Sequence, residues 1–398
     1  DIKKNFNEWL NYFKLELYMR NLNLIGILLF INIPIACSQK ENYPPITDFD
    51  ESLYKLEKVT DGIDIPWGLS FTGEDSFLVT DKKGILYHYS NGSKEIVEGV
   101  PDIVFTRQGG LLDVATDKDF ENNKRVYLTA SISDSGTGSN TALYTATFVN
   151  NNLNDLKLLY KAGPDTEEHR HFGGSILTTN EHVFFTIGDR GNRDVNPQNV
   201  TIDGGKIYRL NLDGSVPDDN PFINVDNSID AIYSYGHRNP QGIINGFKDN
   251  DIWIHEHGPR GGDEINIIKI PNQNEDPLKD RNYGWPKATY GINYSGSEIT
   301  KNRTLENVID PFYYWTPSIA PSGMAYLNSD IYPEWKNSIL VGSLKFLYLE
   351  RLEFSNNGVT KREKLFPGIG RVRDVNISPN GYVYINVEAI GIFKVLPK

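Results

Sequence analysis

Residues 110–129 carry the pattern that decides the fold: Gly110-Leu-Leu-Asp-Val-Ala is a glycine-opened apolar run, and Val126-Tyr-Leu-Thr is a second short run after it. Neither run keeps a 3.6-residue period, and both are rich in aliphatic and β-branched residues, which is typical of short buried strands. The same pair recurs along the chain. The first runs open at Gly68, Gly110, Gly174, Gly242, Gly323 and Val372, and the second runs start at Phe77, Val126, Val183, Ile252, Ile339 and Tyr382.

Six such units predict an all-β fold, a six-bladed β-propeller with four antiparallel strands per blade. Residues 53–59 are expected to add the last strand and close the ring, so that the propeller spans residues 51–398. A β-sandwich is the alternative, but it requires no sixfold pattern. In a propeller, the loops that enter first strands and leave second strands open at the same mouth of the channel. We therefore expect the active site at that mouth.

The composition excludes several classes of function. The chain has 398 residues, a formal net charge of -12 and a single cysteine. One cysteine excludes an intrachain disulfide and any Cys-based metal cluster. The acidic balance argues against a nucleic-acid-binding protein, because phosphate binding requires an excess of Lys and Arg.

The N-terminal segment is interpreted as a targeting sequence. Residues 19–36 contain a basic start and a short apolar run, which indicate a secretory signal rather than a membrane span. The residues before Cys37 resemble a bacterial lipobox, so we expect a lipid anchor on Cys37, a cell-envelope location and a tether over residues 37–50. The alternative is a buried structural cysteine. Residues 1–18 are expected to be an upstream or non-native extension.

The polar residues that distinguish this sequence lie in the two loop classes that should meet at the mouth. They include His171 before a double glycine, which is a candidate general base. The expected lining residues are Gln108, His171, Arg238, Asn239, Lys345, Arg371 and Arg373. Arginine and lysine in this number suit a small polyanion, because they form charge-assisted bonds with carboxylates or phosphates.

Two metal sites are conceivable from the residues. The pairs His169/His171 and His255/His257 suggest zinc, although no third ligand cluster accompanies them, and His237 and His255 are interpreted as structural. Asp263 and Glu264, with the carbonyls of Gly258 and Pro259, are more typical of a hard cation such as calcium. A solvated acidic turn is the alternative for the second group.

Seven motifs in one order resemble the soluble quinoprotein glucose/sorbosone dehydrogenases, and especially the aldose sugar dehydrogenases. The resemblance covers nearly all of residues 55–398. The motifs are Gln108-Gly-Gly-Leu-Leu-Asp, His171-Phe-Gly-Gly, Gly236-His-Arg-Asn-Pro-Gln-Gly, Glu256-His-Gly-Pro-Arg-Gly-Gly-Asp-Glu, Asn282-Tyr-Gly-Trp-Pro, Gly291-Ile-Asn-Tyr-Ser-Gly and Arg371-Val-Arg-Asp.

The resemblance implies a six-bladed propeller that binds pyrroloquinoline quinone (PQQ) and calcium at the channel mouth. It implies that the enzyme oxidises an aldose at the anomeric carbon to the lactone, by hydride transfer to the quinone. In this reading, His171 is the base and Arg238 stabilises charge on the reduced quinone. The remaining implied roles are cofactor binding by Gln108, Arg238, Asn239, Lys345, Arg371 and Arg373, calcium binding by the carbonyls of Gly258 and Pro259, and a second calcium site at Glu264 and the carbonyl of Tyr283.

One departure and two alternatives remain open. Residues 271–280 look longer than the family's usual connection, which puts the second calcium site in doubt. A calcium-dependent propeller lactonase or esterase, or a non-enzymatic carbohydrate- or protein-binding propeller, would share the fold. The expected partners are an aldose and an external electron acceptor, with no nucleic acid and no membrane contact beyond the lipid on Cys37, in a monomer or homodimer.

Overall fold

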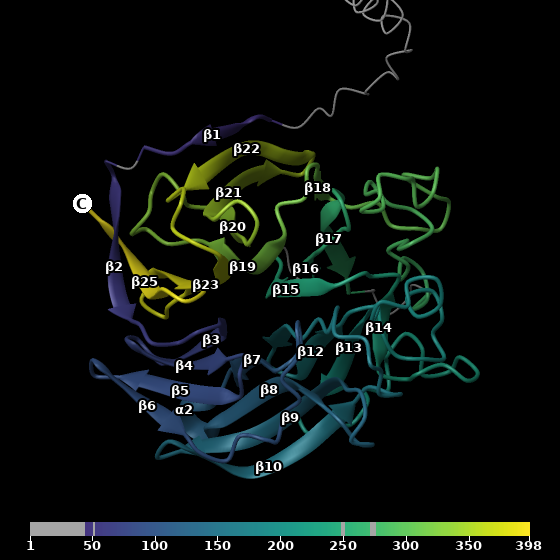
Figure 1. Cartoon of the computed structure of the whole chain (residues 1–398), viewed down its shortest axis with the longest axis horizontal. Helices are drawn as coiled ribbons and strands as arrows, with labels where there is room; N and C mark the ends of the chain where they lie inside the picture. The colour runs from purple at the N-terminus through teal and green to yellow at the C-terminus, as the bar shows by residue number, and fades with distance from the viewer. Residues whose placement is uncertain (1–43, 51, 248–250, 271–275) are drawn as a thin grey trace, which may run out of the picture. The chain divides into compact units, whose positions relative to one another are not determined.

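Pro44–Lys398 forms one compact unit, and the computed structural model describes residues 44–50, 52–247, 251–270 and 276–398 of the chain. Its strands form six sheets arranged around a central channel (Figure 1). The predicted six-bladed β-propeller is therefore confirmed. Residues 1–43, which include the predicted signal sequence and Cys37, lie outside the described residues.

The first three blades follow one another along the chain. They are β3–β6 (Pro66–Gly73, Ser76–Asp81, Ile85–Ser90, Ser93–Val97), β7–β10 (Leu111–Thr116, Arg125–Ile132, Asn140–Val149, Asn152–Lys161) and β11–β14 (Ile176–Thr178, His182–Ile187, Lys206–Asn211, Ile232–Tyr235). A one-turn helix, α2 (Phe120–Asn123), connects β7 to β8. Each blade is antiparallel, with its first strand innermost (Figure 1).

The next two blades repeat this order. They are β15–β18 (Pro240–Asn245, Asp251–Glu256, Asp263–Lys269, Tyr313–Trp315) and β19–β22 (Pro321–Leu327, Ser338–Ser343, Tyr348–Ser355, Gly358–Leu365). A short strand, β1 (Ile46–Asp48), pairs in parallel with the outer edge of β22. The exposed edge of β22 offers free backbone groups to any extended segment beside it. β1 pairs with that edge, so the propeller unit begins within the stretch interpreted as a tether.

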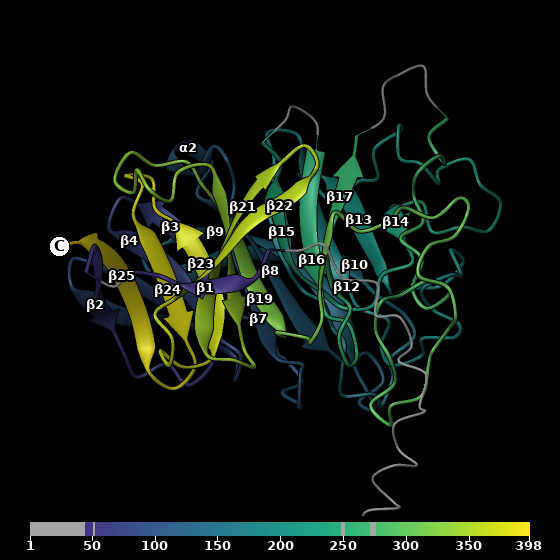
Figure 2. The same cartoon turned by 90° about the horizontal axis from the view of Figure 1, so that it is seen from above.

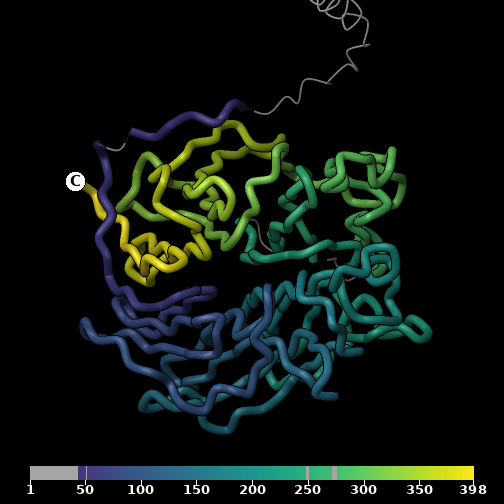
Figure 3. Tube along the Cα trace, viewed as in Figure 1, coloured from purple at the N-terminus to yellow at the C-terminus, as the bar shows by residue number. Residues whose placement is uncertain are grey.

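The sixth blade joins the two ends of the propeller. It consists of β23–β25 (Val372–Ile377, Val383–Val387, Gly391–Pro397) and β2 (Tyr54–Thr60). β2 runs antiparallel to β25, with Tyr54 opposite Pro397. Figure 3 shows the purple N-terminal part of the trace beside the C-terminus. The expectation that residues 53–59 close the ring is confirmed, and closure leaves no open edge on the innermost strands.

The core lies between the blades, where aliphatic and aromatic side chains of adjacent sheets pack face to face. Figure 2 shows the same sheets from above. Between the fifth and sixth blades, Leu340 and Leu349 pack in one cluster with Ile385 and Val395, all fully buried. Each seam of this kind fixes the angle between neighbouring blades. The packing therefore fixes where the loops at the channel mouth lie.

In the described part of the chain, no helix is both long enough and apolar enough to cross a bilayer.

Candidate active site

A cavity of about 1220 Å³ lies at the mouth predicted to hold the active site. Its walls are the loops that enter first strands and leave second strands. Nine of the predicted functional residues line it: Gln108, His171, Arg238, Asn239, Gly258, Pro259, Lys345, Arg371 and Arg373. Their sequence positions span five blades, so only ring closure brings them together.

The cavity has the opposite charge to the chain as a whole. Eight cationic side chains line it against two carboxylates, Glu167 and Glu168, although the chain carries a net charge of -12. The cations are Lys82, Arg107, Arg170, Arg238, Arg260, Lys345, Arg371 and Arg373. A cleft lined by charges of one sign raises the local concentration of ions of the opposite sign. This mouth therefore favours an anionic ligand.

His171 and Asp189 form a buried pair at the wall of the cavity. The distance from His171 Nδ1 to Asp189 Oδ1 is 2.6 Å, and the two residues are 9% and 1% exposed. Burial and the charge of Arg238 lower the pKa of His171, against the opposing effect of Asp189. Burial raises the pKa of Asp189, but the hydrogen bond and charge of His171 hold it below its usual value. The favoured state is thus a neutral imidazole beside an ionised carboxylate.

The other partners of Asp189 fix its orientation. Its Oδ1 also accepts a hydrogen bond from the backbone N–H of Gly191, and its Oδ2 accepts one from Trp285 Nε1 at 2.9 Å. Since Nδ1 of His171 donates to this carboxylate, Nε2 of His171 carries the lone pair. A neutral imidazole with a free Nε2 is the form that a general base requires.

The backbone around His171 explains the double glycine that follows it. His171 has φ 57°, and Gly173 and Gly174 have φ 64° and 104°. A side chain on Gly173 would meet Thr186 O at 2.8 Å, so close approach to β12 requires glycine there. A non-glycine residue in the left-handed region is uncommon, and such residues are enriched at active sites as well as in turns.

Arg238 lies between the cavity and the loop that follows β16. Its Nη1 donates to the carbonyls of His257 and Gly258, at 2.8 and 2.9 Å, and its guanidinium lies 5.5 Å from the ring centre of Trp285. Asn239 is also buried, and its Oδ1 accepts from Gly173 N–H at 3.1 Å. Gln108 Oε1 accepts from His171 N–H at 2.7 Å.

Asp263 braces the turn that presents Gly258, rather than facing a cation. Its Oδ1 accepts from Gly258 N–H and Ser318 Oγ, and its Oδ2 accepts from the N–H groups of Ile319 and Ala320. The interpretation of Asp263 as a cation ligand therefore needs correction, because all four contacts already occupy its carboxylate. Burial raises its pKa to about 6.

Glu264 lies behind this turn, beside a small cavity of about 10 Å³ that it shares with Glu256 and Thr289. Burial and the charge of Glu256 raise the pKa of Glu264, and Asn266 Nδ2 donates to both carboxylates. Tyr283 does not line this cavity, and its ring stacks on His237 at 4.7 Å. The structure thus places Glu264 next to Glu256, and the pairing of Glu264 with Tyr283 stays a prediction.

Arg371 and Arg373 share one counter-ion. Glu388 Oε2 accepts from Arg371 Nε at 2.9 Å and from Arg373 Nε at 2.7 Å. Lys345 lies on the adjacent loop, where Arg371 Nη1 donates to the carbonyl of Leu344 at 3.1 Å, and the Nζ of Lys345 is 5.0 Å from the ring centre of Phe346. One carboxylate for two guanidinium groups leaves this wall positively charged.

The remaining histidines do not form the arrangement that a zinc site would need. His169 and His171 lie in a loop instead of alternating on a strand, and His169 Nδ1 bonds Thr106. His237 lies buried between Ser234 and Glu256, which agrees with a structural role. Among the described residues, no three His, Cys, Asp or Glu side chains form a group that could hold a metal.

Sequence reasoning missed two residues of the site. Asp189 lies in the loop that leaves the second strand of the third blade, and the sequence does not show that it faces His171. Lys82 follows the second strand of the first blade and lines the cavity. The rule that selects loops leaving second strands already points to Lys82.

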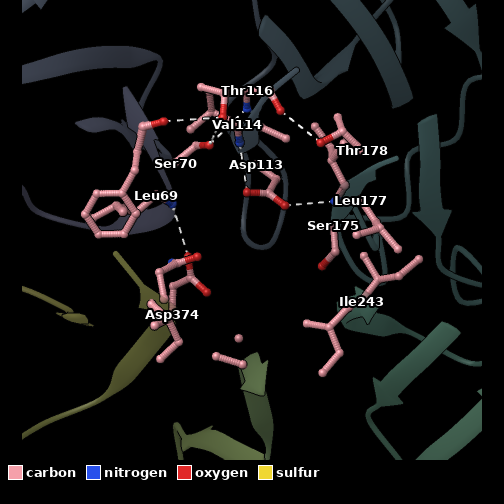
Figure 4. Close-up of a pocket in the computed structure, with 18 of the residues that line it drawn as sticks. Leu69, Ser70, Asp113, Val114, Thr116, Ser175, Leu177, Thr178, Ile243 and Asp374 are labelled. Carbon is pink, nitrogen blue, oxygen red and sulfur yellow. Dashed lines mark hydrogen bonds between the residues drawn. The ribbon is translucent and has the colours of Figure 1, made fainter. Parts of the chain in front are cut away.

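A second cavity of about 740 Å³ occupies the channel and shares Trp67, Gln241 and Arg373 with the first. Asp113 and Asp374 project into it from the second and sixth blades (Figure 4). Asp113 accepts from Ile176 N–H, and Asp374 accepts from Leu69 N–H, so each carboxylate braces its own innermost strand to the next blade. Burial raises the pKa of both groups.

Comparisons with known proteins place this chain among relatives. The aldose sugar dehydrogenase YliI of Escherichia coli (strain K12) is 36% identical over 354 residues, which cover 86% of this chain and 93% of that protein. The crystal structure of the soluble aldose sugar dehydrogenase from Escherichia coli in the apo-form is 34% identical with a TM-score of 0.81, covering 87% of this chain and 100% of that one.

A third relative agrees in fold. The PQQ-bound aldose sugar dehydrogenase from Streptomyces coelicolor is 23% identical with a TM-score of 0.67, covering 89% of this chain and 100% of that one. The family model described as Glucose / Sorbosone dehydrogenase matches residues 63–392. The resemblance drawn from the motifs is thus confirmed, and this chain belongs to the glucose/sorbosone dehydrogenase family.

Proposed function

We propose that this protein is a PQQ-dependent aldose sugar dehydrogenase that oxidises its substrate at the anomeric carbon to the lactone. The observation that carries the proposal is the pair formed by His171 and Asp189 in a cavity with eight cationic side chains. Family membership and the relatives that act on aldoses support it. PQQ is a tricarboxylate, and the cavity wall supplies the cations that such a ligand needs.

The residues fit the cofactor by the chemistry of their donors. Arg371, Arg373 and Lys345 would hold its carboxylates and quinone oxygens, with Gln108 and Asn239 as hydrogen-bonding neighbours. Arg238 would stabilise negative charge on the cofactor's quinone. When bound, PQQ supplies the two-electron acceptor for the hydride that leaves the sugar.

His171 would do the proton chemistry. Its Nε2 lone pair faces away from Asp189 and can take the proton of the anomeric hydroxyl as the C–H bond breaks. Asp189 then stabilises the imidazolium that forms, through the 2.6 Å bond at Nδ1. The gain of positive charge on His171 occurs beside an ionised partner, which lowers the barrier.

Calcium is proposed at the carbonyls of Gly258 and Pro259, which line the same cavity. The turn is rigid, because Asp263 holds Gly258 N–H. His257 Nε2 is a buried atom without a hydrogen-bond partner among the described residues, and it lies beside these carbonyls in sequence and lines the same wall. The carbonyl oxygens of Gly258 and Pro259 are donors that suit a hard cation. Arg238 donates to Gly258 O, so the ion would share that oxygen with the guanidinium.

The second calcium site is proposed at Glu264, with Glu256 as an additional ligand candidate in the small cavity that the two carboxylates share. Burial and, after it, repulsion by the carboxylate of Glu256 raise the pKa of Glu264, and the two side chains share Asn266 Nδ2 as a donor. A divalent ion would relieve that repulsion. Tyr283 remains the predicted carbonyl ligand.

The cellular context stays a proposal. A lipid on Cys37 would tether the propeller to the cell envelope, and an external acceptor would reoxidise the cofactor. Labelling of the expressed full chain with a radioactive fatty acid, compared with Cys37→Ser, tests the anchor. An equal amount of label on both proteins would refute a lipid anchor on Cys37.

The decisive experiment is the visible spectrum of the purified protein with PQQ and CaCl₂, before and after an aldose is added. We expect the quinone absorbance to change to that of the reduced form, and a dye-linked assay to show turnover. An unchanged spectrum with every aldose tested, despite bound PQQ, would refute the proposed activity.

A further inference from the structure

Lys82 is a buried lysine in the wall of the active-site cavity. It follows β4, is 5% exposed and lines the same cavity as His171. Its Nζ donates to the carbonyl of Arg107 at 2.7 Å and to that of Thr106 at 3.3 Å, and lies 5.1 Å from the ring centre of Phe105. An ammonium group has three donors, so a third N–H is left for a ligand.

The charge of Lys82 has no dedicated partner. Within the described ranges, no carboxylate forms an ion pair with its ammonium group. The charged groups that act on it are Arg373 on β23, Glu388 after β24 and Asp81 beside it in sequence. Glu388 already binds two arginines, and Asp81 accepts from the N–H groups of Asp64 and Lys83.

Lys82 and Arg373 are therefore like charges that share a cavity wall without enough anions between them. Burial and the charge of Arg373 lower the pKa of Lys82 to about 8. Buried like charges destabilise a protein unless a counter-ion reaches them. An anionic ligand that enters this cavity would supply that counter-ion.

We propose that Lys82 is a further cofactor-binding residue, which donates to a carboxylate of PQQ on the side of the cavity occupied by Arg373. The inference rests on the proposed function. Lys82 adds a cation from the first blade to the proposed cofactor-binding cations of the fourth, fifth and sixth blades. The anion-binding wall then covers more of the ring.

A structural role for Lys82 makes a different prediction. Its two carbonyl contacts hold residues 106 and 107, which directly precede Gln108, and Gln108 accepts from His171 N–H. If Lys82 only positioned this loop, its loss would disturb His171 and could weaken PQQ binding through Gln108, but the Kd of the parent protein would not depend on the protonation of Lys82, because a neutral amine still donates to the two carbonyls. The pH dependence of the Kd must therefore be measured beside its size, and turnover separately.

The test is a titration of the apo-protein with PQQ in the presence of calcium, followed by quenching of tryptophan fluorescence. Lys82→Met should raise the Kd for PQQ by roughly tenfold to a hundredfold, since a charge-assisted bond is lost. Lys82→Arg should stay within a few-fold of the parent protein. The matched control is Lys83→Met, because Lys83 is exposed and pairs with Asp64 on the surface, and its Kd should not change.

The pH dependence gives a readout that a structural role would not move. Above pH 8, Lys82 must take up a proton to bind the anion, so the Kd of the parent protein should rise with pH. Lys82→Arg keeps its charge, and its Kd should stay flat over the same range. This comparison needs only the parent protein and Lys82→Arg, so it remains decisive if Lys82→Met fails to fold.

Three results separate the possible failures. Parent-like PQQ affinity in folded Lys82→Met, or an equal pH dependence in Lys82→Arg, would overturn the role of Lys82. Reduced turnover at unchanged Kd would assign Lys82 to the positioning of His171 and equally overturn it. Absence of PQQ binding in the parent protein would instead refute the proposed function.

Discussion

Asp189→Asn is the sharpest test of the proposed base. Asp189 accepts from His171 and Gly191 at one oxygen and from Trp285 at the other. An asparagine has one oxygen and one NH₂ group, so either orientation sets two donors against each other. If NH₂ faces His171, Nδ1 must accept, and the proton moves to Nε2, where it blocks the base.

The magnitude follows from the interaction that is lost. A hydrogen bond to a charged group in a buried pair contributes about 1.5–3 kcal/mol, and this stabilisation grows when His171 becomes an imidazolium. Because 1.4 kcal/mol is a factor of ten, kcat should fall about 10- to 150-fold. The Kd for PQQ should hardly change, since Asp189 does not line the cavity.

The sign of the pH effect provides an independent check. Asp189 raises the pKa of His171 against burial and Arg238, so its loss should lower that pKa further. The base must be neutral, so activity is lost as the pH falls through this pKa. The acid limb of kcat/KM should therefore move to lower pH in Asp189→Asn. An acid limb at the parent pH, or a kcat within twofold of the parent, would refute the assignment of His171 and Asp189.

Three further predictions concern the base, the turn and the channel. His171→Gln should lower the rate of cofactor reduction by about 10²- to 10⁴-fold in stopped-flow absorbance, with PQQ still bound, and near-parent rates would remove His171 from the base role. Gly258→Ala would place a Cβ 2.2 Å from Gly262 O and distort the turn, so the rise in melting temperature on adding calcium should be smaller than in the parent protein. An equal rise would argue against calcium at this turn. Burial raises the pKa of Asp374 to about 7, above its value in the unfolded chain, so the free energy of unfolding should fall as the pH rises from about 4 through 7. Urea unfolding at both ends of that range should show a smaller fall in Asp374→Asn, and equal falls would contradict the shift.

The fold could be predicted because its information is local and repeated. Glycine-opened strands such as Gly110-Leu-Leu-Asp occur in five units, a sixth unit opens at Val372, and a repeat of that kind admits few architectures. The pairing of β2 with β25 also followed, since a ring with three strands in its last blade needs a fourth. β1 could not be predicted this way, because its pairing with β22 depends on an exposed edge that exists only after folding.

The site was predictable in position but not in detail. The loop rule brought His171, Arg238 and Lys345 to one mouth, because strand direction alone decides which loops meet there. The pairing of His171 with Asp189, and of Glu388 with two arginines, depends on distances of less than 3 Å across different loops. No spacing in the sequence encodes those distances. Asp263 was interpreted wrongly for the same reason, since three of its four partners lie at residues 318–320, more than fifty residues further along the chain.

The charge of the cavity gives this architecture a thermodynamic consequence. Mutual repulsion among the eight cations at the mouth destabilises the folded protein. The nearby carboxylate Glu388 offsets only part of that repulsion. A ligand that binds only the folded state stabilises that state by RT ln(1 + [L]/Kd), about 2.7 kcal/mol at 100 times the Kd. A bound anion reduces the repulsion among the cations, and this reduction contributes to its binding free energy. The repulsion in the free protein therefore strengthens the binding of an anion. The mouth is thus least stable when empty, and its composition selects for an anionic occupant over a neutral one.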